Sequence, residues 1–66
     1  MNTNFNQVLK RLCKETNTKN KDWKHLDFIE SGVGEEYLLR NDKKKLECYI
    51  CIDQGELHSY NILEAD

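Results

Sequence analysis

Three short apolar runs separated by two turn signals most constrain what this chain can fold into. They lie in residues 35–63, which read EEYLLRNDKKKLECYICIDQGELHSYNIL. The first turn signal is Asn41-Asp42-Lys43-Lys44, where Asn and Asp side chains can bond to nearby backbone and favour a turn. The second is Asp53-Gln54-Gly55, where the glycine can adopt a positive φ. Short strands joined by tight turns predict an antiparallel β-meander.

The turns also predict which residues share a face of the sheet. A two-residue loop at Asp42-Lys43 places Leu39 opposite Leu46. A three-residue loop that ends in a bulge at Gly55 places Ile50 opposite His58. Because side chains alternate between the faces of a strand, one face then collects the apolar residues. These are Tyr37, Leu39, Leu46, Cys48, Ile50, Ile52, Tyr60 and Ile62.

The second turn has an alternative. A two-residue loop at Gln54-Gly55 would turn Leu57 and Leu63 inward. They would take the places of Tyr60 and Ile62. The choice between the two loops sets the register of the last strand, for which we expect residues 57–63.

Residues 23–30, WKHLDFIE, fit two kinds of element. As a strand, followed by a loop at residues 31–34, they would place Phe28 opposite Tyr37 and Leu26 opposite Leu39. As a helix, they would begin at the N-cap Asp22 and end at Gly32, with Trp23, Leu26 and Ile29 as the apolar stripe. We expect the strand, which would extend the apolar face to a fourth strand.

Residues 4–16 have the pattern of an amphipathic helix. The stripe consists of Phe5, Val8, Leu9, Leu12, Cys13 and Thr16. Thr3 or Asn4 can serve as the N-cap, with Gln7 three residues after Asn4. A helix and a sheet each bury one face against a partner, so we expect this helix on the apolar face of the meander. The prediction is one α+β domain over residues 1–66, an N-terminal helix on a three- or four-stranded antiparallel meander.

The remaining segments are polar. Residues 16–22, TNTKNKD, contain no apolar side chain, and we expect a linker or a flexible basic loop. Residues 64–66, EAD, are expected to form a frayed acidic tail. No apolar run is long enough to span a bilayer, and no hydrophobic signal segment follows Met1. With an odd count of three cysteines, this favours reduced thiols in a cytoplasm and no membrane partner.

The cysteines and histidines are the candidates for metal or nucleophilic chemistry. Cys48 and Cys51 have the C-x2-C spacing of zinc sites, which His25, His58 or Cys13 could complete. In a strand, however, residues three apart point to opposite faces. We therefore expect Cys48 in the core and Cys51 as an outward thiol, on the face opposite His58. We predict no catalytic, cofactor or metal site, and no enzyme.

Charge is divided unevenly along the chain. Residues 1–25 carry six Lys or Arg against two acids, whereas residues 26–66 carry four against ten. The basic residues of segment 10–24 surround Trp23, which could stack a base while they contact phosphates. Nucleic-acid binding by this segment is therefore the alternative function.

The face of the sheet turned away from the helix suggests the first function. In the expected register it carries Ile29, Leu38, Tyr49, Cys51, Leu57 and Leu63. A contiguous apolar patch with a polar rim usually marks an interface. We expect it to dock a protein partner or form a homodimer, with an acidic rim that meets a basic surface. The rim consists of Glu35, Glu36, Glu47, Asp53 and Glu56.

Together these features predict a small non-enzymatic protein-binding module, an inhibitor or adaptor that occludes its partner through the sheet face. The chain is rich in Lys and Asn, which have AT-rich codons. A phage or another mobile element is therefore the expected source.

Overall fold

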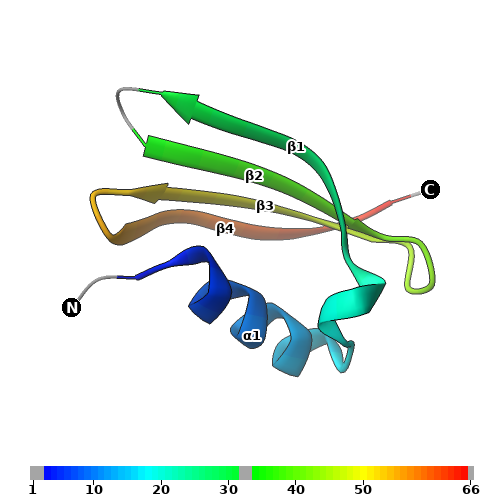
Figure 1. The fold of residues 1–66 in the computed structure, drawn as a ribbon. Helices are drawn as coiled ribbons and strands as arrows, with labels where there is room; N and C mark the ends of the chain where they lie inside the picture. The colour runs from blue at the N-terminus through cyan, green and yellow to red at the C-terminus, as the bar shows by residue number, and fades with distance from the viewer. Residues whose placement is uncertain (1–2, 32–33, 66) are drawn as a thin grey trace.

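The computed structural model describes residues 3–31 and 34–65. Its elements are α1 (Phe5–Thr16), the 3-10 helix η1 (Asn20–Asp22), β1 (Lys24–Ser31), β2 (Gly34–Asn41), β3 (Leu46–Asp53) and β4 (Glu56–Glu64). The four strands form one antiparallel sheet in chain order, with β1 and β4 at its edges. α1 lies along one face of this sheet (Figure 1). The α+β fold is confirmed with four strands, and residues 24–31 form a strand rather than a helix.

α1 begins and ends at asparagines whose local chemistry suits each position. Asn4 is the N-cap: its Oδ1 accepts from Gln7 N at 3.0 Å, and its N donates to Gln7 Oε1 at 3.1 Å. This reciprocal pair satisfies backbone donors that have no partner inside the helix. Asn17 ends the helix in the left-handed region at φ 55°. Thr3 N also donates to Gly55 O at 2.6 Å, which ties the start of the helix to the β3–β4 turn.

The core lies between α1 and the sheet face towards it, which we call the inner face; the opposite one is the outer face. The helix contributes Val8, Leu9 and Leu12, and the inner face contributes Leu39, Cys48, Ile50 and Ile52. Tyr37, Leu46 and Tyr60 pack at its margin. The predicted inner set is therefore confirmed. Its weakest member is Ile62, which lies opposite Cys48 on edge strand β4 and stays 37% exposed.

The β2–β3 hairpin has the predicted face but a different register. Leu39 lies opposite Cys48, not Leu46, because four residues, 42–45, separate the paired strands. The longer turn uses Lys45 at φ 54° and an Asn41 side chain whose Oδ1 accepts from Lys44 N at 3.1 Å. The shift is an even number of residues, so every side chain keeps its face.

The β3–β4 hairpin combines the two predicted alternatives. Its loop is the two-residue Gln54-Gly55, with both residues at positive φ, 51° and 77°, as in a type I′ turn. Ile50 therefore lies opposite Tyr60 rather than His58. A bulge follows, since Ile52 pairs with Leu57 but Cys51 pairs with Ser59.

The two-residue loop and the bulge together decide which side chains of β4 point inward. Leu57 turns to the inner face and packs against the core, which corrects its predicted place in the outer patch. His58 is the additional residue, and after it Tyr60 and Ile62 are again on the inner face, as first predicted. One extra residue reverses the alternation, so neither loop alone predicts the whole strand.

β1 follows its predicted register for half its length. Phe28 lies opposite Tyr37 as expected, but His25 rather than Leu26 lies opposite Leu39. A register shift between His25 and Asp27 leaves Leu26 without a partner in β2. Of the predicted loop 31–34, the two ends Ser31 and Gly34 pair as strand residues, and residues 32 and 33 lie outside the described part.

The polar segments are more ordered than predicted. η1 brings Trp23 into the core, 5% exposed, with its Nε1 donating to Thr18 Oγ1 at 2.8 Å. At the other end, Ala65 is buried and its N donates to Lys45 O at 2.8 Å, so residues 64 and 65 are not frayed. Asp66 lies outside the described residues. Across residues 3–31 and 34–65, no helix combines the length and the apolar character needed to cross a membrane.

Candidate functional site

The outer face is built from alternate residues of all four strands. Strand pairing aligns one row of Asp27, Leu38, Tyr49 and Asn61 and a second row of Ile29, Glu36, Cys51 and Ser59. A third row contains Lys24, Arg40, Glu47 and Leu63. α1 lies on the inner side (Figure 1), and no other helix of the described residues covers these rows.

Apolar side chains are exposed on this face at both edges of the sheet. Ile29 on β1 is 48% exposed and Leu63 on β4 is 55% exposed. Between them, Leu38, Tyr49 and Cys51 are half-buried by their neighbours within the sheet. The predicted outer residues other than Leu57 are therefore brought together on one surface.

A hollow of about 190 Å³ opens on the β1–β3 part of the outer face. It is lined by Asp27, Ile29, Glu36, Leu38 and Tyr49, and the surface that these residues turn towards it is almost wholly apolar. Tyr37 also borders the hollow. Its ring stacks on Phe5 on the inner side at a centroid distance of 4.2 Å, so its contribution is the backbone of β2.

Sequence reasoning missed Asp27 as a residue of this site. Its signal was the alternation of Asp27 with Leu26 and Phe28, which already assigned it to the face opposite Phe28. The predicted rim was drawn from β2, β3 and β4 alone, so the carboxylate on β1 was left out. Pairing of Asp27 with Leu38 confirms that it belongs to the outer face.

Two of the residues that line this hollow, Tyr49 and Glu36, are joined by a hydrogen bond. The Tyr49 hydroxyl donates to Glu36 Oε1 from the neighbouring strand. This hydrogen bond, followed by desolvation and the negative charge of Glu36, raises the pKa of Tyr49 from 10.0 to about 12. The phenol therefore remains a neutral donor near pH 7, and one oxygen of Glu36 is held in place.

The predicted acidic rim is only partly realised. Glu36, Glu47, Asp53 and Glu56 belong to the outer face, since Asp53 pairs with Glu56 beside the turn. Glu35 does not: it lies opposite the buried Ile52, on the inner face, where the Tyr37 hydroxyl donates to it. The error in Glu35 has a simple cause, because neighbouring residues in a strand point to opposite faces.

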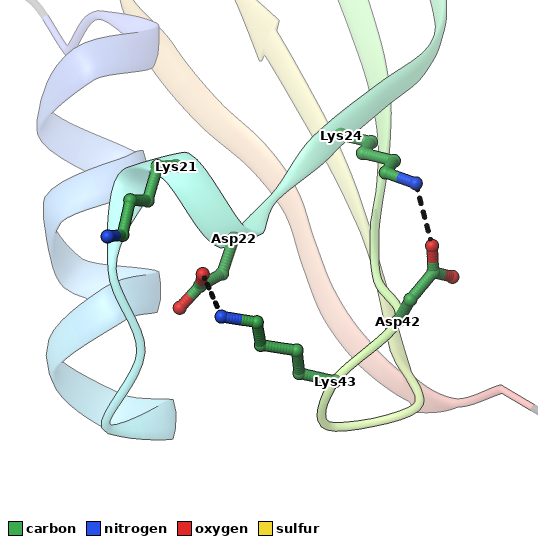
Figure 2. A pocket seen from close by; sticks show the side chains of 5 residues that line it. All are labelled: Lys21, Asp22, Lys24, Asp42 and Lys43. Carbon is green, nitrogen blue, oxygen red and sulfur yellow. Dashed lines mark hydrogen bonds and ion pairs between the residues drawn. The ribbon is translucent and has the colours of Figure 1, made fainter.

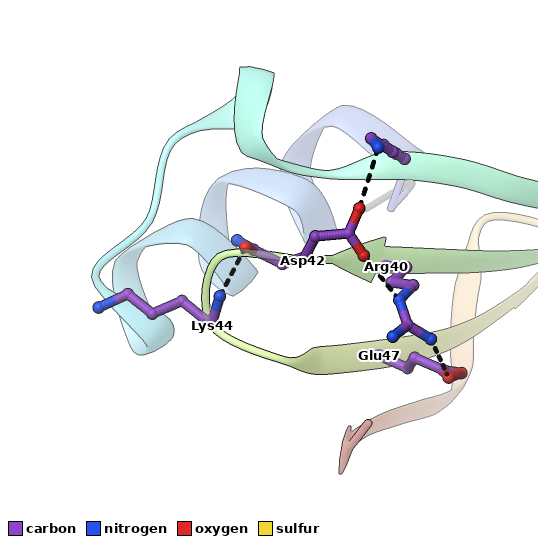
Figure 3. A network of polar contacts seen from close by, with 6 residues as sticks. Arg40, Asp42, Lys44 and Glu47 are labelled. Carbon is purple, nitrogen blue, oxygen red and sulfur yellow. Dashed lines mark hydrogen bonds and ion pairs between the residues drawn. The ribbon is translucent and has the colours of Figure 1, made fainter. Parts of the chain in front are cut away.

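An ion-pair network lies at the end of the outer face near the β2–β3 turn (Figure 3). Arg40 Nε lies 2.8 Å from Asp42 Oδ1, and Arg40 Nη1 lies 3.4 Å from Glu47 Oε1. Lys24 Nζ lies 2.9 Å from Asp42 Oδ2. Hydrogen bonds from Lys24 and then Arg40 lower the pKa of Asp42. Glu47 is thus paired within the chain.

A second, larger hollow of about 410 Å³ lies between η1 and the β2–β3 turn. Its five lining residues are all charged, and four of them form two ion pairs, as Figure 2 shows. Lys43 Nζ lies 3.2 Å from Asp22 Oδ1, and the Lys24–Asp42 pair borders the same space. The hydrogen bond from Lys43 lowers the pKa of Asp22. These pairs fasten the turn to η1 and β1, so we assign this hollow a structural role.

The predicted nucleic-acid segment, residues 10–24, does not present an aromatic platform. Trp23 is buried with its Nε1 bonded, so its ring is not available for a base. Arg11 Nε lies 2.7 Å from Glu15 Oε1, and its guanidinium sits 4.5 Å from the centroid of the Tyr60 ring. Lys24 is paired with Asp42. Nucleic-acid binding by this segment would therefore have to rely on its basic residues without stacking by Trp23.

The two cysteines of the C-x2-C motif lie on opposite faces, as predicted. Cys48 is fully buried in the core, where desolvation raises the pKa of its thiol to about 11, and Cys51 is half-buried on the outer face. His58 is exposed, with its Nε2 3.8 Å from Asp53 Oδ2. Within residues 3–31 and 34–65, no group of three or more His, Cys, Asp or Glu side chains is arranged to hold a metal ion.

Comparison with known proteins finds no protein similar to this chain. The chain matches no protein-family model, no curated protein and no solved structure.

Proposed function

We propose that this chain is a small protein-binding module that docks a partner through the outer face of its sheet. The observation that carries the proposal is a set of apolar side chains on the outer face, which α1 does not cover. Ile29 and Leu63 are about half exposed there, at 48% and 55%, whereas α1 buries the centre of the inner face and leaves only its margin exposed, at Phe28 and Ile62. A contiguous apolar surface with a polar rim is typical of interaction sites.

The charges around the patch describe the partner. Asp27, Glu36, Asp53 and Glu56 lie on the same face as the apolar side chains, while Arg40 is paired with Asp42 and Glu47. A partner with an apolar centre and basic side chains around it would match this arrangement. Binding would hide the partner's own surface, so the module would act by occlusion, as an inhibitor or adaptor.

Affinity capture with a tagged chain, with and without nuclease, tests this function. The double variant Leu38→Glu plus Tyr49→Ser should lose a captured protein that the parent chain retains, because it removes apolar anchors from the outer face. Ile62→Glu is the matched control on the inner face, where Ile62 is also partly exposed. It should retain the protein, and circular dichroism should show that both variants fold.

Two results would contradict the proposal. One is equal capture of the same protein by the parent chain and the double variant. The other is recovery of nucleic acid with loss of every captured protein on nuclease treatment, which would favour the basic residues of segment 10–24 instead.

A further inference from the structure

We infer that the Asp27 side chain blocks the free edge of the sheet and keeps a second copy of this chain from adding a strand to β1. β1 is an edge strand (Figure 1), and within residues 3–31 and 34–65 only β2 pairs with it. The unpaired N–H and C=O groups along such an edge can pair with another chain. The blocked contact is thus made by the backbone of the edge, whereas the proposed docking uses side chains of the outer face.

The side chains of β1 favour such pairing. Phe28 lies opposite Tyr37 on the inner face and is 50% exposed, while Ile29 on the outer face is 48% exposed. A partner on one face of the sheet would cover only one of these two side chains. A strand added at the edge would lie beside both, because its own side chains alternate between the faces. The edge of β1 therefore has apolar side chains on both faces and needs protection from pairing.

Strand pairing directs the backbone of Phe28 towards the free edge. Asp53 and Glu56 close a two-residue turn, and the members of such a closing pair bond to each other through their backbone groups. Successive residues of a strand direct these groups to opposite sides, so Ile50, three residues before Asp53, directs its own towards β2. Tyr37 lies opposite Ile50 and therefore faces β3. Because Phe28 lies opposite Tyr37, its N–H and C=O point away from β2.

The Asp27 side chain occupies this edge donor. Phe28 N donates to Asp27 Oδ1 at 2.9 Å. An added strand would have to offer a carbonyl oxygen to the same N–H, and it would displace the carboxylate from a charge-assisted hydrogen bond. Charged side chains and bulges both protect edge strands in native sheets. β1 has the second device as well, since its register shifts between His25 and Asp27.

The β1 strand of a second copy is the occupant that Asp27 excludes. A two-fold axis beside Phe28 would set the two β1 strands antiparallel, with each Phe28 opposite the other on the inner face. The two exposed rings would then form a cross-strand aromatic pair. On the outer face, residue 27 would lie opposite Ile29 of the second copy. A carboxylate there would lose water to an apolar neighbour, whereas an alanine would fit.

The variant Asp27→Ala tests this role by sedimentation velocity over a range of protein concentrations. We expect it to self-associate at least about tenfold more tightly than the parent chain, because the charge-assisted bond that occupies Phe28 N is lost. Asp27→Asn is the matched control, since it removes the same charge but keeps an oxygen that can accept from Phe28 N. It should associate more weakly than Asp27→Ala, and circular dichroism should show that both variants fold.

Two results of this comparison would overturn the role of Asp27. One is equal association of the parent chain and Asp27→Ala at every concentration. The other is equal association of Asp27→Ala and Asp27→Asn, which would assign the effect to charge alone.

A proline tests whether the association uses the edge of β1. Glu30 lies two residues after Phe28, so its N–H points to the same free edge. Proline removes that donor and is tolerated in edge strands. Asp27→Ala plus Glu30→Pro should therefore associate no more tightly than the parent chain. Association that persists in this double variant would place the contact elsewhere and overturn the inference.

Amide hydrogen exchange of the parent chain tests the contact without any variant. The amides of Phe28 and Glu30 point to the same edge, and the Phe28 amide is bonded to Asp27 Oδ1. After correction for intrinsic rates, we expect Phe28 to exchange about tenfold more slowly than Glu30, the factor for one charge-assisted hydrogen bond. Equal exchange of the two amides would show that Asp27 does not occupy the edge.

Discussion

The two faces of this sheet are made by the same strands, and apolar side chains of the same type differ in burial between them. Leu39 and Leu38 are neighbours on β2: Leu39 is fully buried on the inner face, whereas Leu38 is half-buried on the outer face. Cys48 and Cys51 differ in the same way on β3. Hydrophobicity alone does not separate the members of each pair. The position of α1 does, because it covers one face of the described sheet.

A tyrosine–glutamate pair on each face shows the same difference in electrostatic terms. Tyr37 donates to Glu35 on the inner face, and Tyr49 donates to Glu36 on the outer face. Both pKa values are raised from 10.0 to about 12. Desolvation is the largest cause for Tyr37, whereas the hydrogen bond to Glu36 is the largest cause for Tyr49. Burial is thus the leading cause of the raised tyrosine pKa on the face that the helix covers. On the other face, the leading cause is the hydrogen bond to a specific partner.

The largest expected difference between the faces is in stability. Leu39→Ala should lower the free energy of unfolding by about 3 kcal/mol, since it removes a fully buried side chain and leaves a cavity. Leu38→Ala should cost about 1 kcal/mol or less, because its side chain is only partly removed from water. Urea denaturation of both variants measures this. Equal losses would show that the outer face is as well packed as the inner face.

The cysteines of β3 allow the same comparison of the two faces, with a smaller expected loss of stability. Cys48→Ser places a hydroxyl in the core and should cost about 1–3 kcal/mol, the range for a buried polar group without a partner. Cys51→Ser lies at the half-buried outer position and should stay within about 0.5 kcal/mol of the parent. The two variants are compared by urea denaturation. A large cost at Cys51 would mean that the outer face is covered, for example by a second copy of the chain.

The smallest effect concerns the titration of the tyrosines. Glu36→Gln should lower the pKa of Tyr49 from about 12 towards 10.0, because the negatively charged acceptor is lost. Tyr37 should keep its pKa of about 12, since burial is the leading cause there. Tyrosinate absorbance as a function of pH measures both, and Tyr49→Phe identifies the step that belongs to Tyr49. An unchanged titration curve would exclude the hydrogen bond to Glu36 as the cause.

The sign of the linked stability change follows from these shifts. Each phenol has a higher pKa in the folded chain than its ordinary value of 10.0. The neutral form is therefore favoured by folding, and its contribution to stability is complete below pH 10.0. It is lost as the pH rises through about 12. In Glu36→Gln, the part of this loss due to Tyr49 should shrink, which alkaline unfolding curves would show.

Local patterns were sufficient for the elements and for most of the inner face. The stripe from Phe5 to Thr16 and the capping pair of Asn4 and Gln7 predicted α1 within one residue. Alternation along β2 and β3 predicted the buried set because a shift by two residues preserves every face. For the same reason, alternation could not distinguish the true β2–β3 register from the predicted one.

The errors in the candidate site come from single-residue irregularities. Leu57 was predicted outward because one unbroken alternation was assumed from Ile62 back to the turn, whereas the bulge at His58 reverses it, and nothing in the sequence of β4 requires a bulge there. Trp23 was the proposed stacking residue of the basic segment 10–24, but after η1 its ring lies in the core. Both outcomes depend on contacts between segments distant along the chain.

The sequence by itself determined that the chain forms an amphipathic helix and an antiparallel meander with one strongly apolar face, because these follow from the spacing of apolar side chains and from local turn chemistry. Tertiary structure alone decided the register of the hairpins, the inward turn of Leu57 and the hollow between Asp27, Glu36 and Tyr49. The physical reason is that register and surface shape depend on backbone pairing across strands and on where α1 packs, and neither is encoded within any one segment.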